Sequence, residues 1–261
     1  MKKMKKLVAF LLVAAMMVPM AACGNKVKSV GDIQKSGKLV MATNAEFEPF
    51  EFKDGDAVVG IDVEISQKIA DRLGVELEIS DIAFDTLITA LQSGKADIVA
   101  AGMTADEDRR KNVDFSDAYF NASQAIIVMN DSDIASRGDL NGKKVGVQLG
   151  TTGDKYCTNE DGANDIEVAE VKRYSKGMEA VSDLIAGRID AVVIDDFPAK
   201  KLVEKNADKI QKLDESLTEE EYAIAMPKGS ADLQKEINAV ISEMKESGEL
   251  DQIVSKYIAE E

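Results

Sequence analysis

Apolar residues recur along the chain with two spacings, one typical of helices and the other of strands. The helical spacing is clearest where apolar side chains recur every four residues, at Ile61, Ile65, Ile69 and Leu73. Gly74 follows directly, so this pattern predicts an amphipathic helix that ends at Leu73. Residues 75–79 alternate apolar with acidic side chains, whereas 38–43 and 98–101 are short, mostly apolar runs. These three segments are predicted to be strands.

The second half of the chain repeats this order of elements. Residues 91–99 and 184–192 both read as a helix end, a glycine, a basic residue, an aspartate and a buried strand. Alternating strands and helices favour mostly parallel sheets with helices on both faces, and the repeat indicates two similar α/β lobes. The alternative is that this arrangement is simply frequent in α/β proteins. At the C-terminus, apolar positions over 237–244 and 250–257 predict two helices separated by Gly248.

Three further predictions depend on single residues near the ends of elements. Asp85 is predicted to cap a helix over 86–93. Ser175 is predicted to cap another helix, with Met178 among its inward-facing apolar side chains. The alternating apolar positions between Ile166 and Val171 predict a strand in the second half of the chain.

The first 22 residues have the features of a secretory signal. A lysine-rich start precedes an apolar run over 7–20 that is short for a membrane span. Met20-Ala21-Ala22-Cys23 follows and resembles a bacterial lipobox, although leucine is usual where Met20 stands. The resemblance implies that residues 1–22 are removed, that Cys23 receives a diacylglycerol, and that 23–36 form a lipidated tether. An ordinary cleaved signal or an uncleaved anchor is the alternative.

The composition argues against several classes of function. The chain has 261 residues, a formal net charge of −16 and no histidine. An acidic surface repels phosphate backbones, which argues against a nucleic acid partner. Without histidine, Ser-His-Asp triads and most zinc sites are excluded. With Cys23 assigned to lipid, Cys157 is left alone and offers no disulfide or cysteine-based metal site, so we expect no metal and no cofactor.

Polar segments follow the buried strands that the pattern predicts. Ligands of open α/β sheets bind beyond the carboxyl ends of the strands, so these segments supply the candidate binding residues. They span 43–52, 102–104, 105–111 and 113–117 in the first half of the chain, and 150–153 and 195–198 in the second.

Taken together, these segments resemble solute-binding protein family 3, the amino-acid receptors of bacterial ABC importers. The most specific part is Gly-Met-Thr at 102–104, then Arg109, then Asp-Phe-Ser at 114–116. The resemblance implies a two-lobed periplasmic-binding-protein type II fold, each lobe a mixed, mostly parallel sheet flanked by helices. Lobe 1 would span 37–120 plus 223–261 and lobe 2 would span 124–219, with hinge strands near 119–123 and 219–222. The lobes would close around a ligand by hinge bending.

An α-amino acid carries a carboxylate and an ammonium on one carbon, and Arg109 is the predicted partner of the carboxylate. A planar guanidinium can donate two parallel hydrogen bonds to it. The family has an arginine at this distance from the glycine of the motif. The alternative is that Arg109 merely belongs to a charged helix start over 106–111 that suits the helix dipole.

Four residues at the other strand ends complete the charged part of the predicted site. The resemblance assigns the Thr152 hydroxyl to the ligand carboxylate, whereas the alternative is an ordinary strand-to-helix turn. Thr104 would add a hydroxyl, and the Gly102 carbonyl would accept from the ammonium. Asp195 ends a buried strand, where a carboxylate needs a partner that the ammonium can supply. The family spacing selects Asp195 over its neighbour Asp196.

Phe47 and Phe84 resemble the aromatic pair that encloses the ligand side chain in this family, with core packing as the alternative. Core positions are expected for Phe50, Phe52 and Phe115. Asn44 and Gln148 favour a polar ligand side chain. Relatives that bind cationic amino acids often carry an acid where Asn44 stands, so its absence argues mildly against arginine or lysine, although Glu46 and Glu48 lie nearby in sequence. We predict a polar or charged L-amino acid, with cystine among the candidates.

The sequence therefore predicts a monomeric receptor, held outside the cell membrane by a lipid on Cys23, that captures a free amino acid and delivers it to ABC permease subunits. It is predicted not to be an enzyme. One alternative is a dehydratase or lytic enzyme on the same fold, which would need Glu or Asp as its acid or base. The other is a sensor that binds the amino acid without transporting it.

Overall fold

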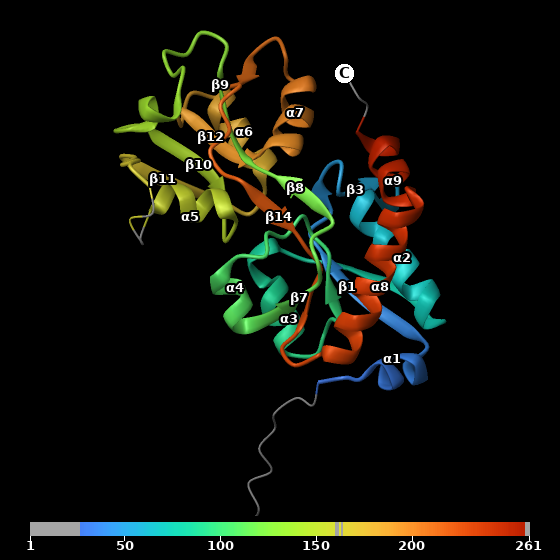
Figure 1. Cartoon of the computed structure of the whole chain (residues 1–261). Helices are drawn as coiled ribbons and strands as arrows, with labels where there is room; N and C mark the ends of the chain where they lie inside the picture. The colour runs from blue at the N-terminus through green and yellow to red at the C-terminus, as the bar shows by residue number, and fades with distance from the viewer. Residues whose placement is uncertain (1–26, 160–161, 163, 259–261) are drawn as a thin grey trace, which may run out of the picture.

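The computed structural model describes residues 27–159, 162 and 164–258. The predicted signal segment 1–22 and the predicted lipidation site, Cys23, lie outside these residues. The described chain forms two lobes, each with its own five-stranded sheet and flanking helices (Figure 1). The predicted two-lobed α/β architecture is confirmed.

The first lobe contains a mixed sheet made from both ends of the described chain. Its strands, in spatial order, are β5 (Glu76–Asp81), β1 (Lys38–Thr43), β6 (Ile98–Val99), β15 (Ala225–Pro227) and β7 (Val113–Phe115). β1 is parallel to β5 and β6, and β15 is antiparallel to β6 and β7. The chain therefore returns to this lobe after crossing the second one.

The second lobe repeats the arrangement. Its strands, in spatial order, are β11 (Glu170–Tyr174), β10 (Lys144–Gln148), β12 (Ala191–Asp195), β9 (Gln124–Met129) and β13 (Ile210–Lys212). β10 is parallel to β11 and β12, whereas β9 is antiparallel to β12 and β13. In both lobes, three parallel strands therefore carry their carboxyl ends to one edge.

Helices cover the sheets, and their buried faces are those that the apolar spacing predicts. The helices of the first lobe are α1 (Val30–Ser36), α2 (Ile61–Leu73), α3 (Leu87–Gln92), α4 (Glu107–Asn112), α8 (Ala231–Ser247) and α9 (Glu249–Tyr257). Those of the second are α5 (Thr152–Thr158), α6 (Gly177–Ile185) and α7 (Asp196–Glu204). The four-residue apolar repeat of α2 is fully buried, and Gly74 ends the helix with a left-handed backbone, as predicted. Figure 1 shows α8 and α9 beside α2.

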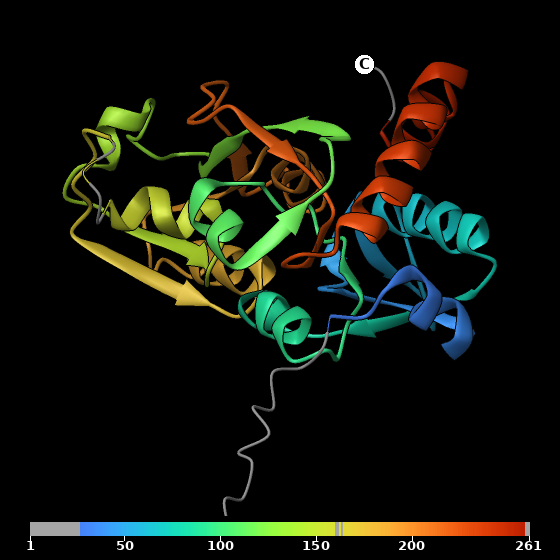
Figure 2. The same cartoon turned by 60° about the horizontal axis from the view of Figure 1, so that its bottom comes forward.

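Two short strands connect the lobes. β8 (Phe120–Ala122) and β14 (Glu220–Tyr222) pair antiparallel with each other and with no strand of either large sheet. Figures 1 and 2 both show this ribbon running between the lobes. A third small sheet, of β2 (Glu46–Phe47), β3 (Glu51–Asp54) and β4 (Ala57–Val59), belongs to the first half of the chain.

The structure corrects the predicted starts of two helices. Asp85 lies inside a 3₁₀ turn, η1 (Phe84–Thr86), and Thr86 rather than Asp85 precedes α3. α6 begins at Gly177 after Lys176, not after a Ser175 cap, because the Lys176 carbonyl accepts from the Glu179 N–H at 3.1 Å and so starts the first turn. Met178 is 57% exposed, since it lies in the first turn, before the residues of α6 that reach the core.

The strand predicted across Ile166 and Val171 is also wrong at its start. Ile166 is buried but belongs to no strand, and β11 begins only at Glu170. The Ile166 N–H donates to the Asn164 side chain at 2.9 Å, and its carbonyl accepts from Asn159 at 3.3 Å. Side-chain amides therefore replace the ladder bonds that a strand would need here.

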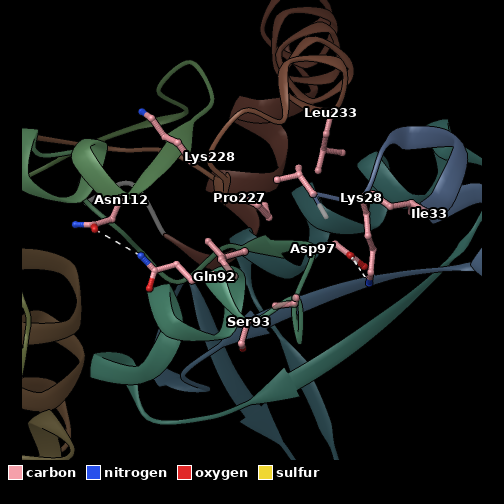
Figure 3. Close-up of a pocket in the computed structure, with 13 residues that line it drawn as sticks. Lys28, Ile33, Gln92, Ser93, Asp97, Asn112, Pro227, Lys228 and Leu233 are labelled. Atoms are coloured by element: carbon pink, nitrogen blue, oxygen red, sulfur yellow. Dashed lines mark hydrogen bonds and ion pairs between the residues drawn. The ribbon is translucent and has the colours of Figure 1, made fainter. Parts of the chain in front are cut away.

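The predicted tether, 23–36, contains a packed helix in its described part. Ile33 of α1 is buried in the core of the first lobe, and Lys28 donates to the buried carboxylate of Asp97 at 2.8 Å (Figure 3). The sequence at 27–37 is compatible with a short helix, but one buried isoleucine and one ion pair are too weak a pattern to predict that the helix packs on the lobe. No helix of the described chain is both long and apolar enough to span a bilayer.

Gly60 is a position where neighbouring backbone atoms leave no room for a side chain. It precedes α2 with φ +131°, and a β-carbon there would lie 2.2 Å from the carbonyl oxygen of Phe50. We expect Gly60→Ala to lower the free energy of unfolding by about 3 kcal/mol or more, measured by urea denaturation. Gly55, with φ +60° and open space around it, is the control, and Gly55→Ala should cost about 1 kcal/mol. Equal losses would contradict the steric explanation.

Candidate ligand-binding cleft

The carboxyl ends of strands from both sheets meet at one narrow cavity between the lobes. It encloses about 300 Å³ of empty space, part of it open to solvent. Its lining residues are Asn44, Phe47, Glu51, Phe84, Gly102, Thr104, Arg109, Gln148, Thr151, Thr152 and Asp195. Every residue that the sequence proposed for ligand binding is among them, and two residues, Glu51 and Thr151, were not foreseen. The topology brings them together because the parallel strands of each lobe end at the same edge.

Arg109 is the buried cation of this cavity. It lies in α4, whose N-cap Asp106 accepts a hydrogen bond from the Arg109 N–H at 2.7 Å. Only 5% of Arg109 is exposed, and its guanidinium stands 5.4 Å from the ring centre of Phe84. It donates to the Thr104 carbonyl at 2.8 Å and to the Gly150 carbonyl of the other lobe at 3.0 Å. Burial lowers the pKa of Arg109, and nearby carboxylates oppose the shift.

Asp195 faces the cavity from the other lobe, at the end of β12. It is buried, and the hydroxyl of Tyr222 in β14 donates to it at 2.5 Å. Burial raises the pKa of the Asp195 carboxyl to about 7, and the negative charge of Glu220 adds to the rise. The neighbouring Asp196 is instead in ion pairs with Lys200 and Lys212. Of the two acids, Asp195 is therefore the one that lacks a cationic partner.

Polar side chains join the two lobes across the cavity. Gln148 of β10 donates to Asn44, directly after β1, at 2.9 Å. The Thr152 hydroxyl donates to the Thr104 hydroxyl at 3.3 Å, and Thr104 in turn donates to Glu220 at 2.5 Å. Together with the bond from Arg109 to Gly150, these contacts show that the structure is a closed form.

The rim of the cleft carries ion pairs between the lobes. Lys155 pairs with Asp106 at 2.7 Å, and the other pairs are Lys176 with Glu46 and Lys205 with Glu48. Glu46 and Glu48 are therefore bound to lysines at the surface and do not line the cavity, contrary to their suggested role in recognising a cationic ligand. Exposed ion pairs of this kind contribute little free energy, so these pairs mark the rim of the cleft but do not determine how stable the closed form is.

The two predicted aromatic residues both line the cavity, but in different surroundings. Phe47 is almost buried and lies against Gly102, where a β-carbon would come within 2.6 Å of its ring. Gly102 has φ +50°, so a glycine is favoured both by the backbone and by the ring. Phe84 is only half-buried and stacks with Arg109. Phe50 and Phe115 are core residues as predicted, whereas Phe52 is half-buried.

Two lining residues were missed in the sequence. Thr151, rather than Thr152, caps α5, since its hydroxyl accepts from the Asp154 N–H at 3.2 Å. Glu51 is fully buried in β3, where no N–H or hydroxyl group donates to it and its hydrogen-bonding neighbour is the carboxyl of Asp62. The signal for Glu51 in the sequence was its place between Phe50 and Phe52, because an acidic residue flanked by two large apolar residues is unusual.

A larger surface pocket lies at the opposite edge of the first lobe (Figure 3). Its lining includes Asp97, just before β6, and Pro227 at the end of the antiparallel β15, so it faces the amino ends of the parallel strands. Its side chains partly pair with one another, as Lys28 does with Asp97 and Gln92 with Asn112. Its position separates it from the cleft, where the charged groups converge.

Other chemistry is scarce in the described part of the chain. No cluster of three or more acidic or cysteine side chains there is arranged to hold a metal ion. Cys157 is buried in the core of the second lobe, and burial raises the pKa of its thiol to about 12, which is typical of an unreactive cysteine.

Comparison with known proteins agrees with this geometry. Residues 39–260 match the family "Bacterial extracellular solute-binding proteins, family 3". The arginine-binding extracellular protein ArtP of Bacillus subtilis is 36% identical over 99% of this chain and 100% of its own. The L-cystine-binding protein TcyJ of Escherichia coli K12 is 32% identical, covering 94% of each chain.

The fold agrees as well. A crystal structure of a mutant of ArgBP from T. maritima superimposes with a TM-score of 0.83 and 42% identity, over 89% of this chain and 100% of that one. The predicted type II periplasmic-binding-protein fold is thus confirmed. The protein is a member of the bacterial extracellular solute-binding proteins of family 3.

Proposed function

We propose that the protein is an extracytoplasmic receptor that captures a polar or charged L-amino acid by closing its cleft and delivers it to an ABC importer. The observation that carries this proposal is that a buried cation, Arg109, and a buried acid, Asp195, reach one cavity from separate lobes. An α-amino acid has the two complementary charges on a single carbon. The proposed role is binding, not catalysis.

Arg109 holds the ligand carboxylate in this proposal. A guanidinium has five N–H donors, and in the closed form two of its hydrogen bonds go to the Thr104 and Gly150 carbonyls. These bonds fix the orientation of the guanidinium and leave further donors for the carboxylate. The hydroxyl of Thr152, at the first turn of α5, supplies another donor.

Asp195 holds the ligand ammonium. Its partner Tyr222 offers a neutral hydroxyl, which does not balance the negative charge of Asp195. An ion pair between Asp195 and the ligand ammonium compensates both groups for the hydration that they lose on burial. The carbonyl of Gly102 and the hydroxyl of Thr104, both in the cavity wall, are further acceptors for the ammonium. Phe47 and Phe84 enclose the ligand side chain, with Asn44 and Gln148 at its polar end.

Closure occurs by bending at β8 and β14, close to the predicted hinges at 119–123 and 219–222. Lobe 1 then comprises 37–120 plus 223–261, and lobe 2 comprises 124–219. A ligand that contacts both lobes stabilises the closed form over the open one, and the importer recognises the closed form. We propose that the receptor works as a monomer, because each described lobe contributes its own half of the site.

The N-terminus places the receptor at the membrane. We propose that residues 1–22 are a lipoprotein signal peptide and that Cys23 carries a lipid with acyl chains such as palmitate. What supports this is the basic start, the apolar run and the small residues before the cysteine. The acyl chains hold the protein on the outer face of the cell membrane, with the segment after Cys23 as spacer.

Removal of the Arg109 side chain tests the proposed function directly. We expect Arg109→Ala to weaken binding of the preferred amino acid by about 2–5 kcal/mol in calorimetry, because the buried carboxylate loses its partner. The control is Arg110→Ala, since Arg110 is exposed and donates only to the Ala105 carbonyl at 3.0 Å. That variant should keep affinity within about threefold. An unchanged affinity in Arg109→Ala would refute the assignment.

The affinity should also depend on pH through Asp195. Burial raises the pKa of the Asp195 carboxyl to about 7, so below pH 7 the carboxyl takes up a proton that must leave before the ammonium can pair with it. Affinity for a neutral ligand such as glutamine should therefore fall below pH 7, by at most about tenfold per pH unit. The other titratable groups facing Asp195 are Glu220, Tyr222, Arg109 and Glu51.

Two neighbouring variants separate Asp195 from those groups. Asp195→Asn should weaken glutamine binding at pH 8 and flatten the profile between pH 5 and 8. Asp196→Asn should preserve both the affinity and the profile, since Asp196 is already paired with lysines. A flat profile in the unaltered protein would contradict the role given to Asp195.

The lipid anchor has its own test. We expect Cys23→Ala to release the protein from the membrane fraction into the medium when it is expressed with its own N-terminus in a Gram-positive host. Cys157→Ala, which alters a buried thiol, should leave the protein in the membrane fraction. Membrane retention of both variants alike would argue against lipidation at Cys23.

A further inference from the structure

A buried acid, Glu220, stands behind the cleft on the connecting strand β14. Only 7% of it is exposed, and it is not among the described residues that line the cavity. Its carboxylate accepts hydrogen bonds from the hydroxyls of Thr104 at 2.5 Å and Thr218 at 2.6 Å. These donors are neutral and do not cancel its charge. A buried carboxylate that is held in this way acts strongly on the groups around it.

The two bonds place Glu220 in a chain of hydrogen bonds that runs between the lobes. At the start of β9, the Gln124 N–H donates to the Thr218 hydroxyl at 2.9 Å, and Thr218 donates to Glu220. The chain continues from Glu220 to Thr104 of the first lobe, which also accepts from Thr152 of the second at 3.3 Å. The carboxylate is therefore fixed on one side by Thr218 and holds Thr104 on the other.

The single hydrogen of the Thr104 hydroxyl determines what this group can offer to a ligand. A threonine hydroxyl donates one hydrogen and accepts through two lone pairs. In Thr104 the hydrogen is directed to Glu220, so lone pairs remain for the cavity that Thr104 lines. Such a hydroxyl can accept from an ammonium but has no hydrogen left for a carboxylate. The bond to Glu220 thus assigns Thr104 to the ammonium end of a ligand.

The strand that carries Glu220 also orients the other acceptor of the ammonium. Residues two apart on a strand point to the same face, and Tyr222, two residues after Glu220, donates to Asp195 at 2.5 Å. One strand therefore holds Thr104 of the first lobe and Asp195 of the second. The negative charge of Glu220 also reaches Asp195, where it adds to the effect of burial in raising the pKa of that carboxyl.

We propose that Glu220 is a positioning residue for the ligand ammonium. It holds the Thr104 hydroxyl as an acceptor and places a second negative charge beside Asp195, without itself touching the ligand. The site then favours a primary ammonium next to the ligand carboxylate over any neutral group at that position. The inference rests on the proposed function, because it requires the α-ammonium to lie between Thr104 and Asp195.

A double-mutant cycle tests whether Glu220 acts through Thr104. The probe is whichever of L-arginine, L-glutamine and L-cystine the unaltered protein binds most tightly in calorimetry at pH 8. Glu220→Gln should weaken its binding at least about tenfold, because Thr104 loses a charged acceptor and the ammonium loses a nearby negative charge. In the background of Thr104→Val, which has no hydroxyl, the same change should weaken binding at most about threefold.

Glu221→Gln is the matched control, since Glu221 is the next residue of β14 and is exposed. This variant should keep the affinity within about twofold. The inference is overturned if Glu220→Gln keeps the original affinity. It is also overturned if Glu220→Gln weakens binding by the same factor with and without the Thr104 hydroxyl, which is the result of a purely structural role. Binding of no amino acid at all by the unaltered protein would refute the proposed function, and this inference with it.

The pH profile gives a second readout that a structural role would not change. Because the charge of Glu220 adds to the raised pKa of Asp195, Glu220→Gln should lower that pKa. The variant should therefore lose less affinity to the unaltered protein at pH 5.5 than at pH 8. Arg109 and Tyr222, which also face Glu220, keep their charge over this range, and Glu51, which faces Asp195, is present in both proteins. Equal losses at both pH values would contradict the inference.

Thr218→Val covers the case in which Glu220→Gln does not fold. Thr218 does not line the cavity among the described residues, so its hydroxyl acts on the ligand through Glu220. We expect Thr218→Val to weaken binding about threefold, and to cause no further loss in the background of Thr104→Val. Thr218→Ser, which keeps the hydroxyl, should bind as the unaltered protein does. Unchanged affinity in Thr218→Val, or an equal loss in both backgrounds, would overturn the inference.

Discussion

The cost of burying charge is the constraint on which this structure depends. The cleft places a guanidinium and two carboxylates where water is largely excluded, and each must be offset by a group of opposite charge or by a proton. Asp106 pairs with Arg109 at 3.5 Å, and the remaining partners are neutral: carbonyls for Arg109 and a hydroxyl for Asp195. The carbonyls and the hydroxyl orient the charged groups without cancelling their charge. In the proposed function, the two charges of an amino acid supply the rest of the electrostatic balance.

The same contacts explain why closure and recognition are a single event. The bond from Arg109 to the Gly150 carbonyl and the bond from Gln148 to Asn44 both cross from one lobe to the other. Neither can form while the cleft is open, so the site is complete only in the closed form. The rim pairs, such as Lys155 with Asp106, are exposed and add little free energy. A ligand that bridges the lobes therefore contributes the main difference in free energy between the open and closed forms. Such a difference is required for a ligand to shift their populations.

Much of the fold and most of the cavity lining were predictable from the sequence because they follow from periodicity, strand ends and one motif. The α2 repeat and the two similar sheets need only local patterns, Asp195 stands at the end of a predicted strand, and Arg109 lies at the distance from Gly102 that the family motif has. Glu51 was not predictable, because its place in the cavity wall comes from burial beside Asp62, which depends on segments distant in sequence. The prediction that Met178 faces inward was wrong for a related reason. The apolar spacing of α6 is regular, but the first turn of the helix lies beyond the edge of the core.

The hinge is chemically part of the site. Tyr222 lies on β14, one of the two strands that connect the lobes, and its hydroxyl contacts Asp195 of the second lobe. Its backbone forms a bridge with Thr104 of the first lobe, and Glu220 on the same strand accepts from the Thr104 hydroxyl. If the lobes close by bending at β8 and β14, as proposed, a change of charge at Asp195 acts on a residue of a bending strand. Because Tyr222 is buried against Phe50 and Phe120, it cannot turn away to relieve that change. In the proposed function, the charge state of the cleft and the angle between the lobes are thus linked through one side chain, because an ammonium that neutralises Asp195 would also favour the geometry in which Tyr222 reaches it.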